Sequence, residues 1–271
     1  MPASEPLLID TSRGALFAVY HPAEGAGDTA VLFCHAFGEE RKSSALTLAR
    51  LARAVAKAGL PTLRFDYYGT GDSEGDFVEA DVETRLEDME TAAGWLRERT
   101  GCKRVVLLGL RLGATLAARA AERMEQVGGL VLIEPVSDGE KYLGGELRRQ
   151  LVRQMMTHGK GSASREEIME SLQDDEFVFD LDGFGITGGT YRQICALNMA
   201  DVTCTGPVQV VQLHFNEKPK SELEAICQAY RDAGAEVTFE KIVLPPIWNR
   251  IDITLAPELD EKVTGWLTDG G

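Results

Sequence analysis

Three short and almost continuously apolar runs constrain the fold of this chain more than any other feature of its sequence. They are residues 30–34 (AVLFC), 104–108 (RVVLL) and 129–133 (GLVLI). A strand that is apolar at nearly every position must be buried on both faces, which is typical of a parallel sheet covered by helices. Longer amphipathic stretches separate the runs, and this alternation predicts an α/β protein with a mostly parallel sheet.

The other predicted elements continue the same alternation. An antiparallel hairpin is predicted at one edge of the sheet, from residues 7–10 and 15–21. Further strands are predicted at residues 61–66, 208–213 and 237–242. The amphipathic stretches predict helices at residues 44–58, 82–99, 114–125, 221–234 and 257–267. Parallel strands need long crossover connections, and these helices supply them.

The regular alternation stops between residues 137 and 205. This stretch contains two helical patterns, near residues 141–157 and 164–173, and then a segment rich in glycine and aspartate up to Gly189. It contains no strand of comparable apolar quality. We therefore predict a core made of residues 1–136 and 206–271, and an insert of residues 137–205 that lies over the sheet as a cap.

The composition argues against several classes of function. The 271 residues carry a formal net charge of −15, so we expect no nucleic-acid-binding surface and no docking on anionic lipid. No apolar run approaches the roughly 20 residues that span a bilayer, and the first ten residues do not resemble a secretory signal. The five cysteines are scattered, without the spacing of a metal or redox site. We expect a cytoplasmic protein without a metal or an organic cofactor.

Residues 105–117 (VVLLGLRLGATLA) predict a sharp turn from a buried strand into a helix. Gly109 and Gly113 stand two residues before and two residues after Arg111. In a nucleophile elbow, small residues at these positions relieve crowding and lift the central residue to the mouth of the sheet, above a helix N-terminus. Arg111 is therefore predicted to occupy the position at which a serine hydrolase carries its nucleophile.

Four segments give the chain a resemblance to a known superfamily. They are residues 33–40 (FCHAFGEE), 64–77 (RFDYYGTGDSEGDF), 109–114 (GLRLGA) and 245–249 (PPIWN). With these segments the chain resembles the α/β-hydrolases near their serine aminopeptidase branch. It is most similar to the bacterial exosortase-A-system-associated hydrolases, in which an elbow of the form G-L-R-L-G-A is normal. The resemblance covers nearly the whole chain and implies the α/β-hydrolase fold, with helices on both faces of the sheet.

The resemblance also implies an oxyanion hole made of two backbone N–H groups. One belongs to Leu112, which follows the nucleophile position, and the other to Phe37, in the loop after the strand of residues 30–34. His35 stands in the same loop, where its expected role is to orient the backbone. We therefore expect that the geometry for binding an oxyanion is retained.

The three positions of the Ser-His-Asp triad all depart from the superfamily pattern. Arg111 replaces the serine, and a guanidinium cannot act as a nucleophile at physiological pH. The acid normally follows the strand of residues 208–213, but residues 214–217 read His-Phe-Asn-Glu. The base normally lies in the loop of residues 245–252, which contains no histidine. We therefore expect that the acyl-enzyme chemistry of the superfamily is lost.

The other candidate nucleophiles and bases are predicted to be structural. His21 is expected at the surface, His158 in the solvated insert, His214 at a strand end, Cys34 in the core and Ser73 in a turn. The alternative hypothesis is a carboxylic-ester or thioester hydrolase whose nucleophile has moved to another position.

An anion beside Arg111 would explain why an arginine can stand at this position. A cation at a helix N-terminus is repelled by the helix dipole, so an anion is expected between them. The carboxylates available near the predicted elbow are those of Glu39, Glu40, Glu134 and Asp138. If one of them pairs with Arg111, the arginine is a structural plug. If none does, Arg111, His35 and the elbow N–H groups form a pocket for a carboxylate or phosphate.

The leading hypothesis from the sequence is a pseudoenzyme of the α/β-hydrolase fold. It would bind a small anionic or acyl ligand, or a protein partner, without forming a covalent intermediate. The sequence pattern favours no particular oligomeric state.

Overall fold

An eight-stranded sheet forms the centre of the structure, a computed structural model that describes residues 3–25, 27–158, 164–215, 218–250 and 254–269. Its strands are β1 (Glu5–Ile9), β2 (Leu16–His21), β3 (Thr29–Cys34), β4 (Thr62–Phe65), β5 (Arg104–Leu110), β6 (Val127–Ile133), β9 (Val208–His214) and β10 (Val237–Val243). The strand order is β1-β2-β4-β3-β5-β6-β9-β10. β2 pairs antiparallel with β1 and β4, and the other pairs are parallel, so the predicted mostly parallel sheet with an edge hairpin is confirmed.

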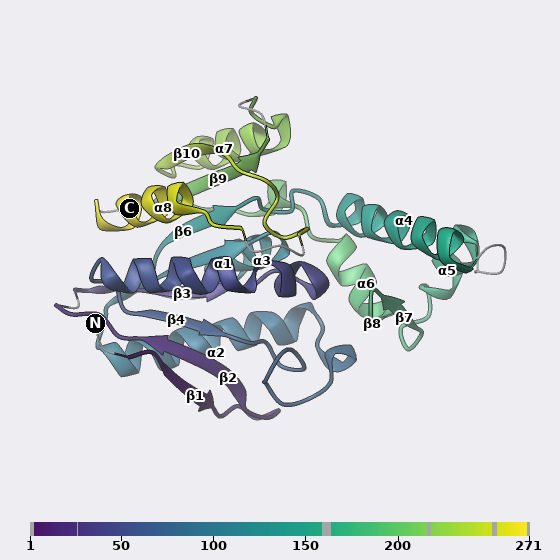
Figure 1. Cartoon of the computed structure of the whole chain (residues 1–271), viewed down its shortest axis with the longest axis horizontal. Helices are drawn as coiled ribbons and strands as arrows, with labels where there is room; N and C mark the ends of the chain where they lie inside the picture. The colour runs from purple at the N-terminus through teal and green to yellow at the C-terminus, as the bar shows by residue number, and fades with distance from the viewer. Residues whose placement is uncertain (1–2, 26, 159–163, 216–217, 251–253, 270–271) are drawn as a thin grey trace.

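Helices cover both faces of this sheet (Figure 1). One face packs against α1 (Gly38–Lys57) and α8 (Pro257–Thr268). The other face packs against α2 (Val82–Thr100), α3 (Leu112–Ala121) and α7 (Ser221–Asp232). Successive residues of a strand point to opposite faces, so Leu107 of β5 lies in one core cluster and Leu108 in the other. β5 lies in the interior of the strand order, as its apolar sequence predicted.

The chain between β6 and β9 forms further elements beyond one end of the sheet (Figure 1). They are α4 (Gly139–His158), α5 (Arg165–Ser171), β7 (Val178–Leu181), β8 (Phe184–Thr187), α6 (Gly188–Cys195) and the 3-10 turn η2 (Met199–Asp201). The two predicted helices are present, but the hairpin of β7 and β8 and the helix α6 were missed. Asp182 and Gly183, both with positive φ, form its two-residue turn, and an Asp-Gly pair at such a turn is a strong hairpin signal.

Two predicted helix boundaries are wrong. α1 begins at Gly38 instead of residue 44, with the extended Phe37 as its N-cap. This places Glu39 and Glu40 in the first turn, where the helix dipole favours negative charge. α3 ends at Ala121 instead of residue 125, because a turn with Gln126 at positive φ leads directly into β6.

A second 3-10 turn, η1 (Phe77–Glu79), closes the glycine-rich loop that follows β4. No helix in the described ranges is long and apolar enough to cross a bilayer.

Candidate functional site

Arg111 occupies a strained turn between β5 and α3. Its backbone has φ 55° and ψ −125°, a conformation that residues other than glycine rarely adopt. The flanking glycines are required by close packing. A Cβ on Gly113 would lie 2.1 Å from the carbonyl oxygen of His35, and one on Gly109 would lie 2.4 Å from Cα of Ala114. The predicted elbow geometry is therefore present, with an arginine at its apex.

The Arg111 side chain contacts four segments that are distant in the sequence. Its Nε donates to Oε1 of Glu40, from α1, at 3.1 Å. Its Nη1 donates to the carbonyl oxygen of Glu134, just after β6, at 3.3 Å. The guanidinium carbon lies 4.8 Å from the ring centroid of Trp248 and 5.5 Å from that of Tyr142. Cation–π contacts of this kind strengthen when the charge is desolvated, and Arg111 is only 18% exposed.

Glu40 completes the group around Arg111. Its second carboxylate oxygen accepts a hydrogen bond from the Tyr142 hydroxyl at 3.0 Å, and its side chain is 10% exposed. Burial, the largest single effect, lowers the pKa of Arg111, but the charge and hydrogen bond of Glu40, together with the charges of Tyr142 and Glu134, outweigh it and the pKa is raised. Burial, followed by the charge of Glu40, raises the pKa of Tyr142. The arginine therefore remains a cation and the phenol remains a donor. Glu40 is thus the one of the four predicted acidic partners that pairs with Arg111. Through its Nε edge Arg111 is therefore the structural plug of the first alternative, and only the rest of the guanidinium could serve a ligand.

Glu39 and Asp138 pair with lysines instead. Glu39 faces solvent and lies 3.2 Å from Nζ of Lys42, one turn along α1. Asp138 precedes α4, accepts from the backbone N–H of Lys141 at 2.9 Å and lies 3.3 Å from Nζ of the same residue. Both carboxylates are satisfied locally, as acidic residues near a helix N-terminus commonly are.

Glu134 meets Arg111 through its backbone only. Its carboxylate accepts from the backbone N–H of Leu213 at 2.9 Å and from Nζ of Lys220 at 2.6 Å. The side chain of Glu134 is 2% exposed and its φ is 46°. The strained backbone turns the carbonyl of Glu134 toward Arg111 while its carboxylate binds Lys220.

Two cavities of different size lie on either side of this group. The first, of about 20 Å³, is lined by Phe37, Glu40 and Tyr142 among others. The second, of about 180 Å³, is lined by Arg111, Tyr142 and Lys220 among others. Nη2 of Arg111 has no hydrogen-bond partner among the described residues, and Arg111 borders only the second of these two cavities. The Phe37 side of the elbow is nearly filled, whereas the Lys220 side is open.

The residues predicted to form an oxyanion hole lie close to the elbow. Leu112 is the first residue of α3, so its N–H has no partner within the helix. Phe37 caps α1 and lines the smaller cavity. His35 is buried below them, and burial, together with the charges of Arg41 and Arg64, lowers its pKa to about 3. His35 is therefore neutral and contributes no positive charge to an anion site.

A serine–histidine hydrogen bond does occur in the described part of the chain, at the sheet edge. Oγ of Ser4 lies 2.7 Å from Nδ1 of His21, and Nε of Arg64 donates to Nε2 of His21 at 3.3 Å. Because Nε2 accepts, the neutral ring carries its proton on Nδ1 and donates to the serine. Burial and Arg64 also lower the pKa of His21 to about 4. This histidine cannot take a proton from Ser4, and the prediction that it lies at the surface is wrong because it is 2% exposed.

The other candidates for a relocated site are engaged in structural contacts. Cys34 is buried in the core, which raises the pKa of its thiol. The Ser73 hydroxyl donates to the carbonyl oxygen of Asp66 at 2.6 Å and accepts from the N–H of Phe17 at 2.8 Å. The ring of His214 packs against that of Phe215 at the end of β9. The side chain of His158, and residues 216–217 and 251–252 of the two segments in which the superfamily's acid and base normally lie, are outside the described residues.

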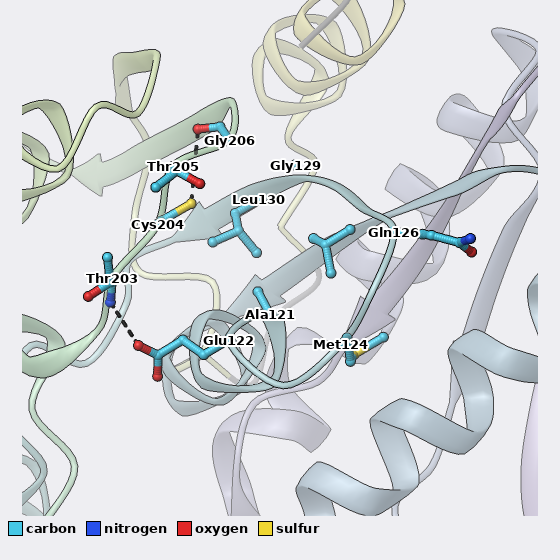
Figure 2. A pocket seen from close by; sticks show the side chains of 11 residues that line it. Ala121, Glu122, Met124, Gln126, Gly129, Leu130, Thr203, Cys204, Thr205 and Gly206 are labelled. Carbon is cyan, nitrogen blue, oxygen red and sulfur yellow. Dashed lines mark hydrogen bonds between the residues drawn. The ribbon is translucent and has the colours of Figure 1, made fainter.

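A larger cavity, of about 570 Å³, lies at the opposite end of α3 (Figure 2). Two of its polar side chains are already engaged with other lining residues. Glu122 accepts from the backbone N–H of Thr203 at 2.9 Å, and the Cys204 thiol contacts the carbonyl oxygen of Gly206. Burial raises the pKa of Cys204, which makes this thiol a poor nucleophile. Cavity size alone therefore does not identify the functional site.

Within the described ranges, no group of three or more histidine, cysteine or acidic side chains is arranged to hold a metal ion.

Comparison with known proteins agrees with the observed fold. The family model described as serine aminopeptidase, S33, matches residues 25–178, more than half of the chain. The chain belongs to the serine aminopeptidase S33 family. Its fold is that of the α/β-hydrolases, as the resemblance implied. The narrower resemblance to the exosortase-associated group stays a prediction.

Two solved structures illustrate the similarity of this S33 family member to known folds. Est1E from Butyrivibrio proteoclasticus with bound ferulic acid has a TM-score of 0.69 at 17% identity, covering 97% of this chain and 98% of that one. The Pyrococcus furiosus esterase Pf2001 has a TM-score of 0.67 at 15% identity, covering 99% and 91%. At these identities the likeness shows the fold alone.

Curated relatives match a smaller part of the chain. Human Protein ABHD12B is 30% identical over 119 residues, which cover 44% of this chain and 32% of that protein. An uncharacterized 31.7 kDa protein from the traX-finO intergenic region of Escherichia coli is 29% identical over 120 residues, which cover 43% and 41%. The aligned stretch thus spans 32% to 41% of the length of these relatives.

Proposed function

We propose that this S33 family member is a pseudoenzyme that binds a small anionic or acyl ligand beside Arg111 and forms no covalent intermediate. One observation carries this proposal. The guanidinium at the apex of the elbow is held by Glu40 on one edge, while its Nη2 has no partner among the described residues and Arg111 borders a cavity of about 180 Å³.

The small cavity argues against acyl transfer at the elbow. A hydrolase must place the substrate carbonyl between its nucleophile and the oxyanion donors. Here the space beside Phe37 is about 20 Å³, close to the minimum that holds one water molecule. The ion pair of Arg111 and Glu40 and the hydrogen bond from Tyr142 lie beside this space. An ester could enter only if this buried group came apart.

The larger cavity supports binding instead. Arginine donates to carboxylate or phosphate oxygens in charge-assisted hydrogen bonds, which are about twice as strong as neutral ones. Tyr142 and Lys141, from the segment between β6 and β9, contribute to the wall of this cavity. We therefore include in the proposal that residues 137–205 act as a cap. The scattered cysteines, without metal or redox spacing, are the separate ground on which we propose a cytoplasmic protein. A protein partner that presents a carboxylate would bind to the same Arg111 guanidinium.

Covalent labelling and turnover test the non-catalytic part of the proposal. The protein is exposed to a fluorophosphonate probe and its intact mass is measured; hydrolysis of p-nitrophenyl butyrate is followed in parallel. We expect no adduct, and turnover no faster than that of the Arg111→Gln variant. A stoichiometric adduct mapped to one serine would overturn the proposal and establish a hydrolase with a relocated nucleophile.

A measurement of anion binding tests the proposed ligand site beside Arg111. We expect acetate, a singly charged anion, to raise the melting temperature of the wild-type protein, and Arg111→Gln, checked for a native circular dichroism spectrum, to abolish this effect. Arg119→Gln is the matched control, because Arg119 lies on the same helix and pairs with Glu122 at the surface. An equal response in wild type and Arg111→Gln would refute the role of Arg111.

A further inference from the structure

The cavity beside Arg111 adjoins a second cavity of about 220 Å³. The two share four lining residues, which are Ser137, Asp138, Lys141 and Glu222. The second cavity runs between the turn η2 and one face of α7. Together they form a continuous site that begins at the elbow and extends away from the nearly filled Phe37 side.

The far part of this site is apolar. Ala225 and Ala229 lie one turn apart on α7, so their small side chains leave room along one face of the helix. Ile226 and Met199, both buried, line the same space. Such a surface accommodates a hydrocarbon side group.

The near part of the site carries charges of both signs, and most of them are already neutralised. Lys220 binds Glu134, Lys141 binds Asp138, and Nε of Arg111 binds Glu40. Two charged groups remain available. One is Nη2 of Arg111, and the other is the carboxylate of Glu222, which has no hydrogen-bond or ion-pair partner among the residues that the structure describes. A doubly charged anion would face an excess of carboxylates here, whereas a ligand with one negative and one positive group would satisfy both.

We propose that the ligand is a small zwitterion with an apolar side group, of the class of the apolar α-amino acids. Its carboxylate accepts from Nη2 of Arg111, its ammonium lies beside Glu222, and its side group lies against Ala225 and Ala229. The three groups of such a molecule branch from one carbon atom, which would lie at the rim that the two cavities share, between Arg111 and the apolar groove. This inference rests on the proposed function and gives the chemical class of its ligand.

A set of four probes tests the assignment by isothermal titration at low salt. Leucine carries all three groups, 4-methylpentanoate lacks the ammonium, 3-methylbutylamine lacks the carboxylate, and glycine lacks the side group. We expect leucine to bind most tightly, with at least about tenfold weaker binding of glycine, since each well-packed methylene contributes about that much. Binding of leucine no tighter than that of glycine would overturn the apolar groove.

Glu222 provides the decisive variant because it is exposed and its substitution leaves the core intact. Glu222→Gln should weaken leucine about two- to fivefold, the range of an exposed ion pair, and should strengthen 4-methylpentanoate. Glu224→Gln, in the same turn of α7 but outside the site, is the control and should change neither. Equal effects of the two variants would refute the role of Glu222.

Filling the groove gives an independent readout. Ala225→Leu should weaken leucine and leave acetate unchanged, whereas Ala233→Leu, at the far end of α7, should change neither. If acetate binds through Arg111 but leucine gains nothing over it, the zwitterion class is wrong and the proposed function stands. If none of the probes binds, acetate included, the proposed function fails as well.

Discussion

Removal of the Arg111 charge tests whether this residue is a structural plug. In Arg111→Met the side chain stays unbranched and flexible but is shorter and loses its cation. Glu40 then remains at the elbow with its side chain 10% exposed and without its ion-pair partner. Breaking a buried pair on one side costs about 3–5 kcal/mol, because an uncompensated charge stays buried. The Tyr142 hydroxyl still donates to Glu40, so we expect a loss at the lower end, about 3 kcal/mol.

Urea unfolding, monitored by circular dichroism, measures this loss of unfolding free energy. At about 2–4 °C per kcal/mol for chains of this size class, the same change should lower the melting temperature by about 6–12 °C. Arg119→Met is the matched control. Arg119 and Glu122 form a surface pair whose side chains are 40% and 27% exposed, so its loss should cost less than about 1 kcal/mol.

The double variant Arg111→Met, Glu40→Leu separates charge burial from packing. Replacing both partners of a buried pair by apolar residues is often neutral or stabilising, so the double variant should be more stable than Arg111→Met alone. If Arg111→Met shifts the unfolding midpoint no more than Arg119→Met does, Arg111 is not a buried plug and the reasoning is refuted.

Two further predictions concern the elbow glycine and the buried histidine. Gly113→Ala places a Cβ 2.1 Å from the His35 carbonyl oxygen and should lower stability by about 1–3 kcal/mol. Gly94→Ala, in open space on α2, is the control and should raise stability by about 0.5–1 kcal/mol. Equal melting temperatures of the two variants would contradict the crowded elbow. Burial and Arg64 lower the pKa of His21 to about 4, so the folded state favours the neutral ring. The stability that the neutral ring contributes is complete above about pH 6.5, the ordinary pKa of histidine, and is lost as the pH falls through about 4. His21→Gln should therefore reduce the slope of urea midpoint against pH in this window, and an unchanged slope would refute the assignment.

Local patterns in the sequence were sufficient to predict the sheet and the elbow. The continuous apolar runs became β3, β5 and β6 because a strand buried on both faces requires apolar residues at successive positions. The spacing of Gly109 and Gly113 around Arg111 predicted the turn, and the contacts that exclude a side chain at Gly109 do come from the same segment, Gly113 and Ala114. The contacts at Gly113 come from the backbone of Cys34 and His35, which only the folded sheet brings there. The Asp-Gly turn of the β7–β8 hairpin was also readable, but it was overlooked.

The partner of Arg111 was decided by tertiary structure. Four carboxylates were available, and their choice depended on where α1 begins, because a start at Gly38 places Glu39 toward solvent and Glu40 against the elbow. The contacts of Tyr142 and Trp248 with Arg111 depend on segments that meet only after the sheet is assembled. The burial of His21 depends likewise on the pairing of β2 with β4.

The sequence by itself therefore determined the fold class and the residue at the apex of the elbow, since both follow from hydrophobic periodicity and from glycine positions within one short segment. Only the tertiary structure decided which edge of the Arg111 guanidinium is occupied and which remains available, because Glu40, Glu134, Tyr142 and Trp248 approach it from four different parts of the chain.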